Sequence, residues 1–196
     1  MPLWGNTDAD ESTPKWLTTA QKKEVYANAE GWVVEAGSTM TGNDNTSADP
    51  EILVAIGGLA TNIGAADVTE VEWITTAADK SDGFTLSVRV RYNEAVTVTG
   101  SPTLAVTNGN QGSGSGRGPH TLVYASGSGS NELVFNLAIG ANNAATKVND
   151  VLTIGAQNIA KPGGATIKDA SGTASDSAVA ISSGQGTAAG SITVVA

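Results

Sequence analysis

The chain has 196 residues, a formal net charge of −9 and no cysteine. This length is sufficient to bury a core without metal or disulfide staples, and the missing cysteines exclude thiolate catalysis and cysteine metal sites. The acidic charge argues against a nucleic-acid partner and an anionic membrane partner, because both require clustered Lys and Arg. Apolar residues make up 40% of the chain but aromatic residues only 5%, with 24 glycines. This mixture is typical of an all-β protein.

We assign residues 1–66 to an N-terminal anchoring region that begins with an extended arm. The arm starts MPLWGNTDADESTPKW, which lacks the basic and apolar segments of a secretion signal, so we expect assembly in the cytoplasm. Thr18 or Thr19 is a candidate N-cap, which predicts one short helix that runs to about Asn28, with Gly31 near its end.

Two short strands should follow that helix. The segment GWVVE at residues 31–35 predicts the first, and residues 39–50 form a polar Asn/Asp/Gly loop. The second lies in a continuous apolar run, which suits a strand buried on both faces or one buried at a subunit contact. The residues of this run are Ile52, Leu53, Val54, Ala55 and Ile56.

Residues 67–183 contain about seven short β runs, separated by Gly, Asn, Pro and Ser clusters. In two of these runs apolar and polar residues alternate with a period of two, which gives each strand one apolar face. The alternating apolar residues are Phe84, Leu86, Val88 and Val90 in one run, and Leu133, Phe135, Leu137 and Ile139 in the other. The predicted fold is therefore mainly β, with an Ig-like antiparallel β-sandwich. Residues 184–196 form a small-residue linker that ends in a strand.

The glycine-rich segment at residues 108–118 invites a phosphate-loop interpretation. A dinucleotide loop is followed by a helix, and a Walker loop requires Lys followed by Ser or Thr. Here a strand-like run follows instead, so the segment is interpreted as a long hairpin connection with Arg117 as a contact residue. The sole histidine, His120, starts that run, and we interpret it as a surface or edge residue because no nucleophile set accompanies it.

Two acidic clusters suggest calcium, because this ion prefers carboxylate and carbonyl oxygens. Neither matches the spacing of a calcium-binding loop with a distal Glu, so solvated Asx turns are favoured and no cofactor is expected, with structural calcium as the weaker alternative. The clusters are Asp8, Asp10 and Glu11 in the arm, and Asn43, Asp44, Asn45 and Asp49 in the polar loop.

Four tryptophans divide into two pairs. Trp4 and Trp16 flank the charged arm, where they could stack on sugars or anchor the arm to another subunit, and we favour anchoring. Trp32 and Trp73 lie in strand-like runs and are predicted to be core residues.

The motifs of the second part resemble the immunoglobulin-like repeats of bacterial surface and adhesin-type proteins. The resemblance covers residues 67–179 and rests on NEAVTVTGSPTLAVTNG, the turn YASGSGSNELVF and the closing segment ATIKDASGTA. It implies a sandwich used for display or adhesion and no catalytic residues. The longer connection before His120 departs from those repeats.

The arm is similar to the start of virion structural proteins of contractile-tailed marine phages, especially those of cyanobacteria. The matching residues are Leu3, Trp4, Gly5, Asn6, Asp8, Pro14, Lys15, Trp16 and Leu17. This resemblance implies a particle component assembled in the host cytoplasm. Its partners would be major capsid, neck or tail subunits and copies of itself.

Together these patterns predict a non-enzymatic virion protein, with a head decoration protein favoured over a neck or tail component. The alternative is a carbohydrate-binding or adhesive module that uses Trp4, Tyr124 and the glycine loop to bind surface glycans. The docking set predicted for the first hypothesis is Trp4, Trp16, Leu17, Ile52, Leu53, Val54, Ile56 and Arg117.

Overall fold

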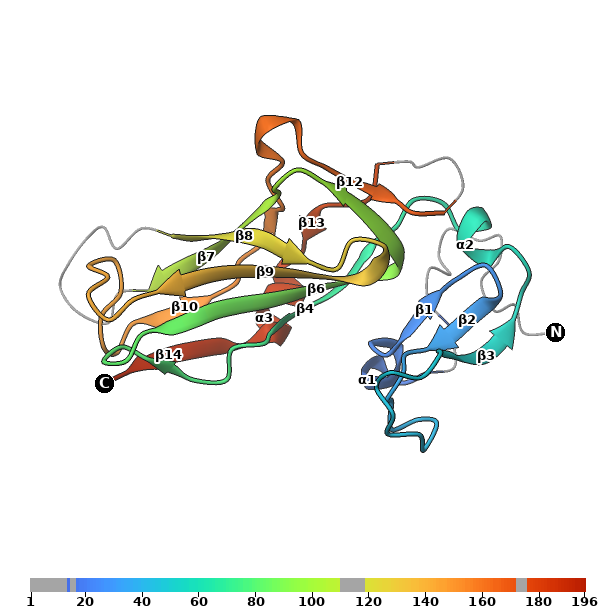
Figure 1. The fold of residues 1–196 in the computed structure, drawn as a ribbon, viewed down its shortest axis with the longest axis horizontal. Helices are drawn as coiled ribbons and strands as arrows, with labels where there is room; N and C mark the ends of the chain where they lie inside the picture. Colours follow the sequence, from blue (N-terminus) through green and yellow to red (C-terminus); the bar gives the residue numbers. More distant parts are fainter. Residues whose placement is uncertain (1–13, 15–16, 110–118, 172–175) are drawn as a thin grey trace.

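The computed structural model describes residues 14, 17–109, 119–171 and 176–196. Figure 1 shows two parts, a small group of strands near the start of the chain and a larger sandwich. Each part has its own hydrophobic cluster, and the division between the clusters falls between Ile63 and Ala66. We call residues 17–63 the N-terminal subdomain and the described residues from 66 onward the sandwich.

The N-terminal subdomain is a three-stranded antiparallel sheet with two short helices. In chain order its elements are α1 (Thr19–Lys22), β1 (Val25–Ala27), β2 (Gly31–Val34), β3 (Glu51–Ala55) and α2 (Leu59–Asn62). The sheet has the order β3–β2–β1, so β2 is central and the fully buried Trp32 on it belongs to the cluster beneath. The predicted strand at residues 31–35 and the core position of Trp32 are confirmed.

The predicted helix to Asn28 is wrong beyond its first turn. Thr18 caps α1 through a capping box with Gln21, as the N-cap pattern predicted, but the helix ends after Lys22. The next residues form β1, because pairing with β2 buries Val25 and Ala27 almost completely. Tertiary pairing overrides local helix propensity at this point.

The sandwich is built around one long strand, β6 (Phe84–Thr99). It pairs with β9 along one side, and with β4 and then β12 along the other. From β9 the strand order continues through β8, β7, β10 and β14 to β5. The bounds of the strands are β4 (Val68–Trp73), β5 (Ala78–Asp79), β7 (Thr103–Gly109), β8 (His120–Ser126), β9 (Ser130–Ile139), β10 (Val151–Thr153), β11 (Gln157–Asn158), β12 (Thr166–Asp169), β13 (Ala180–Ile181) and β14 (Ser191–Val195).

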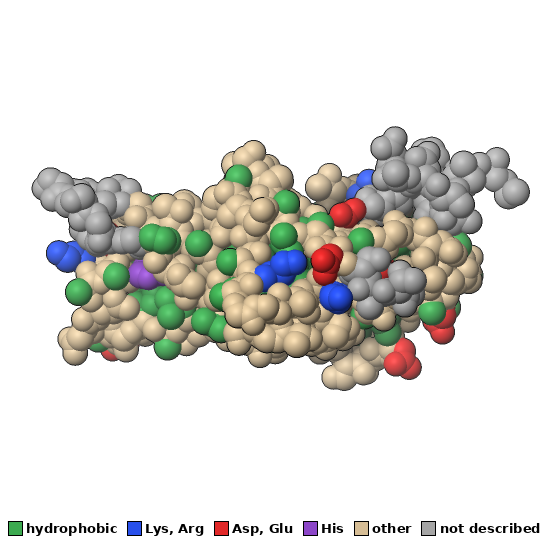
Figure 2. Space-filling model, turned by 90° about the horizontal axis from the view of Figure 1, so that it is seen from above, with side chains coloured by type: hydrophobic (Ala, Val, Ile, Leu, Met, Phe, Trp, Pro, Cys, Tyr) green, Lys and Arg blue, Asp and Glu red, His purple; other side chains and the backbone are tan. Residues whose placement is uncertain are grey.

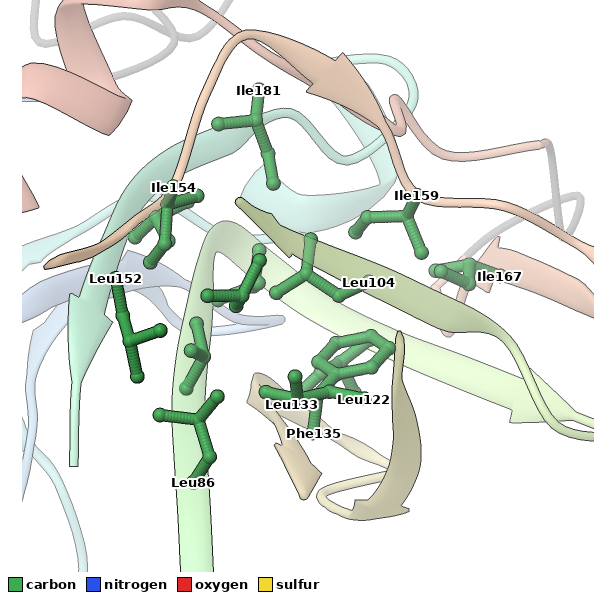
Figure 3. Close-up of a cluster of buried hydrophobic side chains, with 14 of the residues drawn as sticks. Leu86, Leu104, Leu122, Leu133, Phe135, Leu152, Ile154, Ile159, Ile167 and Ile181 are labelled. Carbon is green, nitrogen blue, oxygen red and sulfur yellow. The ribbon is translucent and has the colours of Figure 1, made fainter. Parts of the chain in front are cut away.

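The core of the sandwich is almost entirely aliphatic, as the composition predicted. Figure 3 shows leucine and isoleucine side chains from several strands gathered in one cluster, with the ring of Phe135 between Leu122 and Leu133. Leu86, Leu104, Leu122, Leu133 and Leu152 are each fully buried there. Apolar burial at these alternating strand positions stabilises the fold by about 1.5–3 kcal/mol per side chain. The mainly β fold with a sandwich is confirmed.

The C-terminal residues are part of the sandwich and not a linker. After a short 3-10 turn at Pro162–Gly164, strand β12 and strand β13, the chain forms helix α3 (Ser183–Ala189), capped by a Ser182–Gln185 capping box. Strand β14 then pairs with β10 and β5 of the same chain, and Val194 is fully buried. Within the part of the chain that the structure describes, the helices are too short to cross a membrane.

Candidate functional site

Strand β3 carries the most exposed large apolar side chain among the described residues. Among the described residues β3 pairs with β2 alone, so no described strand covers its other edge. Ile52 on that strand is 52% exposed. A free edge offers unpaired backbone N–H and C=O groups to another chain, and an exposed apolar side chain adds burial on contact.

The other described members of the predicted docking set pack against their own chain. Leu17, Leu53, Val54 and Ile56 lie half-buried against the cluster of the N-terminal subdomain. The prediction of a strand buried on both faces is therefore wrong, because β3 lies at a sheet edge and covers the cluster from one side. Trp4, Trp16 and Arg117 lie outside the described residues.

Arg91 of β6 joins the subdomain to the sandwich. Its Nη1 donates to the backbone oxygen of Lys23 at 2.6 Å and to Oε2 of Glu35 at 2.9 Å, both in the subdomain. On the sandwich side its Nη2 lies 2.9 Å from Oε1 of Glu132, and its Nε donates to Oε1 of Glu72 at 3.3 Å. The Arg91 side chain is only 8% exposed, so these contacts form a largely desolvated joint.

The electrostatics of this joint favour a charged guanidinium. Burial lowers the pKa of Arg91, but the charges of Glu132, Glu35 and Glu72 outweigh burial and raise it above its ordinary value. Burial also raises the pKa of Glu35, and the opposing charge of Arg91 offsets this only in part. Beside this joint, Lys23 forms a second ion pair with Glu70 of β4. Ion pairs of Arg91 from the sandwich and of Lys23 from the subdomain thus hold the two parts together.

A second contact between the two parts is built from carboxyl groups. The parallel bridge between Ala27 and Glu94 brings β1 against β6. The Ser171 hydroxyl lies 2.8 Å from the backbone oxygen of Ala60 in α2, 3.0 Å from Oε2 of Glu94 and 2.8 Å from Oδ1 of Asp169. Glu94 is fully buried and Asp169 is 5% exposed.

His120 is not the surface residue that the sequence predicted. It is 4% exposed, and its Nε2 lies 3.0 Å from Oγ1 of the fully buried Thr146. Asn108 lies beside the ring and donates to Oδ2 of Asp150 at 3.0 Å. This network attaches the loop after β9 to the start of β8. Because the histidine and the threonine are both buried, the pair offers no accessible nucleophile.

The remaining site predictions concern the turns. Asn43 and Asn45 form consecutive Asx turns, each side chain accepting from the backbone N–H two residues later, as the solvated-turn interpretation predicted. Among the described residues, no three His, Asp or Glu side chains gather in a way that could hold a metal ion. Asp8, Asp10 and Glu11 lie outside them.

The glycine-rich segment connects two paired strands. β7 ends at Gly109, β8 begins at His120, and the two strands are antiparallel, which confirms the hairpin interpretation. Residues 110–118 lie outside the described residues. Trp73 was predicted to be a core residue, but it is only half-buried at the margin of the sandwich cluster, where its Nε1 donates to the backbone oxygen of Gly190 at 3.4 Å.

In comparisons with known proteins, no family model, curated protein or solved structure matches the chain. The geometry above and the two resemblances in the sequence are therefore what point to a function. Sequence patterns did not predict the joint at Arg91 or the cluster at Glu94. The alternation in β6 marked Arg91 as a polar position, but its partners in the subdomain are more than 50 residues away in the chain.

Proposed function

We propose that the protein is a virion structural protein, a head decoration protein in the first instance, that docks through its N-terminal region and displays the sandwich. The observation that carries this proposal is the free edge of β3 with its exposed Ile52. Leu17, the last residue of the arm, packs on the hydrophobic cluster of the same subdomain. The arm is the segment that resembles phage virion proteins.

Docking would use two kinds of contact. A strand from a capsid subunit adds to the free edge of β3 through backbone hydrogen bonds, and Ile52 becomes buried against it. Trp4 and Trp16 of the arm anchor to the same subunit as large aromatic side chains. Each contact alone has a low affinity. Two linked contacts per copy and many copies on one particle raise the overall affinity.

The surface of the sandwich suits display. Figure 2 shows one face of the molecule, on which backbone and uncharged side chains dominate over the sandwich and most visible acidic side chains lie over the half that contains the N-terminal subdomain. The joint at Arg91 holds the N-terminal subdomain, and with it the β3 edge, against the sandwich. A neck or tail position would use the same contacts.

The glycan-binding alternative has less support in the described residues. The ring of Tyr124 packs edge-on against Phe135 at a centroid distance of 6.1 Å. Its hydroxyl accepts from the backbone N–H of Ser128 at 2.8 Å. A sugar would have to displace one of these contacts to stack on this ring.

The proposal is tested by the composition of purified particles. We expect the chain to co-purify with gradient-purified virions in a constant ratio to the major capsid protein, measured by quantitative mass spectrometry. Deletion of residues 1–13, which removes Trp4 and retains Trp16, should strongly reduce this association and leave the fold intact by circular dichroism, because the buried Pro14 and the partly buried Leu17 are retained. Absence of the full chain from complete particles, or normal incorporation of the truncated chain, would refute the proposal.

A further inference from the structure

The hydrogen bonds around Ser171 require a proton that a serine alone does not supply. Three oxygens lie within 3.0 Å of the Ser171 hydroxyl, and they belong to Ala60, Glu94 and Asp169. A hydroxyl has one proton and can donate to only one of them. The backbone oxygen of Ala60 has no proton to give. A proton on one of the two carboxyl groups would give this cluster a second donor.

Of the two carboxyl groups, Glu94 has the surroundings that favour the protonated form. Asp169 already accepts the backbone N–H of Ser171 at 2.6 Å, a contact that stabilises a carboxylate. Glu94 is fully buried, its Oε2 meets only the Ser171 hydroxyl, and its Oε1 has no hydrogen-bond partner among the described residues. A buried carboxylate with a single hydroxyl donor and no paired cation among the described residues is strongly disfavoured, whereas the neutral acid can itself donate to Ser171 Oγ.

The charges that face Glu94 act in the same direction. Asp169 at the end of β12 and Asp67 before β4 are both acidic, and neither β1 nor α2 contains a charged residue. Arg91, on the same strand, is already paired with three glutamates. Burial, the largest cause, and the charges of Asp169 and Asp67 together raise the pKa of Glu94 to about 8, although the hydrogen bond from Ser171 opposes the shift.

We propose that a proton on Glu94 is a latch that holds α2 of the N-terminal subdomain against the sandwich and that opens at alkaline pH. With Glu94 protonated, its hydroxyl donates to Ser171 Oγ, and the Ser171 hydroxyl donates to the backbone oxygen of Ala60. When Glu94 releases its proton to solvent, the new carboxylate attracts the Ser171 proton. The Ala60 oxygen then loses its donor, two carboxylates face each other, and the contact between the two parts separates.

The joint at Arg91 remains charged through this transition, so the subdomain stays attached on that side. The expected motion is a hinge opening at the Ser171 contact, not dissociation or global unfolding. The latch does not depend on the proposed function: it would change the orientation of the β3 edge relative to the sandwich whatever partner that edge contacts.

The latch is tested by fluorescence energy transfer between dyes on Asp44→Cys and Val148→Cys, because the chain has no other cysteine and both positions are exposed. We expect the transfer efficiency to change between pH 6 and pH 9.5 with a midpoint near 8, as the pKa of Glu94 dictates. Glu94→Gln, a neutral isostere, should remove the transition, and Asp169→Asn should lower its midpoint. The matched control Glu51→Gln, at an exposed position, should leave it unchanged.

Direct titration covers the case in which the Glu94 variants do not fold. Carbon NMR of the wild-type chain labelled at its glutamate carboxyls should show one group titrating near pH 8. A spectrum in which every glutamate carboxyl titrates below pH 6 would overturn the proposal. A pH-dependent change in energy transfer that persists in Glu94→Gln would also overturn it. Calcium at pH 7 that raises the melting temperature of the wild type but not of Glu94→Gln would also overturn it, because a cation would then occupy the place of the proton.

Discussion

Replacement of Arg91 by methionine measures how much the joint between the subdomain and the sandwich contributes to the free energy of unfolding. Methionine keeps most of the apolar volume and removes the charge. It cannot donate a hydrogen bond to Glu35 or to the backbone oxygen of Lys23, which Arg91 reaches at 2.9 Å and 2.6 Å. Glu72 and Glu132 keep Arg89, whose Nη1 lies 3.1 Å and 3.4 Å from them.

The expected cost follows from the burial of these groups. Removing one partner of a buried ion pair costs about 3–5 kcal/mol. Because the Glu35 side chain remains 25% exposed, we expect the lower end, about 3 kcal/mol in the free energy of unfolding. The matched control Arg89→Met removes a cation that is 31% exposed and should cost about 0–1 kcal/mol.

Urea unfolding followed by tryptophan fluorescence and by circular dichroism measures both variants. The double variant Arg91→Met with Glu35→Gln should be more stable than Arg91→Met alone, because it no longer leaves a carboxylate without its cation. If Arg91→Met costs no more than Arg89→Met, or if Glu35→Gln recovers nothing in the Arg91→Met background, the reasoning about the joint is refuted.

Two further predictions concern the sandwich. Burial lowers the pKa of His120 below 6.5, although the charge of Asp150 opposes this shift. The folded state therefore binds fewer protons than the unfolded state. The stability that the neutral ring provides is present above pH 6.5 and is lost as the pH falls through the pKa of the folded state. The difference in melting temperature between the wild type and His120→Gln should therefore shrink from pH 7 to pH 5.5, and a constant difference would contradict a buried neutral ring. Gly127→Ala should lower the free energy of unfolding by about 2–4 kcal/mol, because Gly127 has φ 109° and a Cβ there would lie 1.8 Å from the Glu132 backbone oxygen. The control Gly129→Ala, at φ 89° with open space around it, should cost only about 1 kcal/mol, and equal costs would exclude the clash as the cause.

The sandwich strands could be predicted from sequence because two local signals agree there. Apolar alternation marks the buried face of β6 and β9, and turn residues mark the strand ends, so both strands were predicted. Pairing with β12 extends β6 beyond its alternating residues to Thr99. The division near residue 66 also coincides with the gap between the two hydrophobic clusters.

The errors occurred where local signals conflict with tertiary pairing. β1 lies in a segment rich in Ala, Lys and Glu that favours a helix, and only its pairing with β2 makes it a strand. For helix α3 the local sequence favoured a linker, whereas the structure has a helix. Its Ser182–Gln185 capping box was present in the sequence, but three Gly and Ser residues in its first four positions are typical of a linker. Packing on β4, where Gln185 donates to the Val68 oxygen at 2.8 Å, compensates for the low propensity.

The contacts between the two parts could not be predicted from sequence. They depend on pairs such as Ala60 with Ser171, which are 111 residues apart in the chain. His120 was misassigned for the same reason, because its partner Thr146 lies in a loop 26 residues later, with no motif that links them. Charge alone did not distinguish Arg91, which is buried, from Arg89, which is partly exposed.

The most direct test of the proposed docking is the fraction of chain bound to particles when the β3 edge alone is altered. Ile52→Lys places a charge on the free edge, a substitution that protects edge strands from pairing. Val123→Lys is the matched control, at an apolar side chain 42% exposed on the sandwich strand β8. In gradient sedimentation of a virion-producing lysate, we expect Ile52→Lys to move from the particle band to the free fraction while Val123→Lys stays with the particles. Equal incorporation of both variants would contradict docking through this edge.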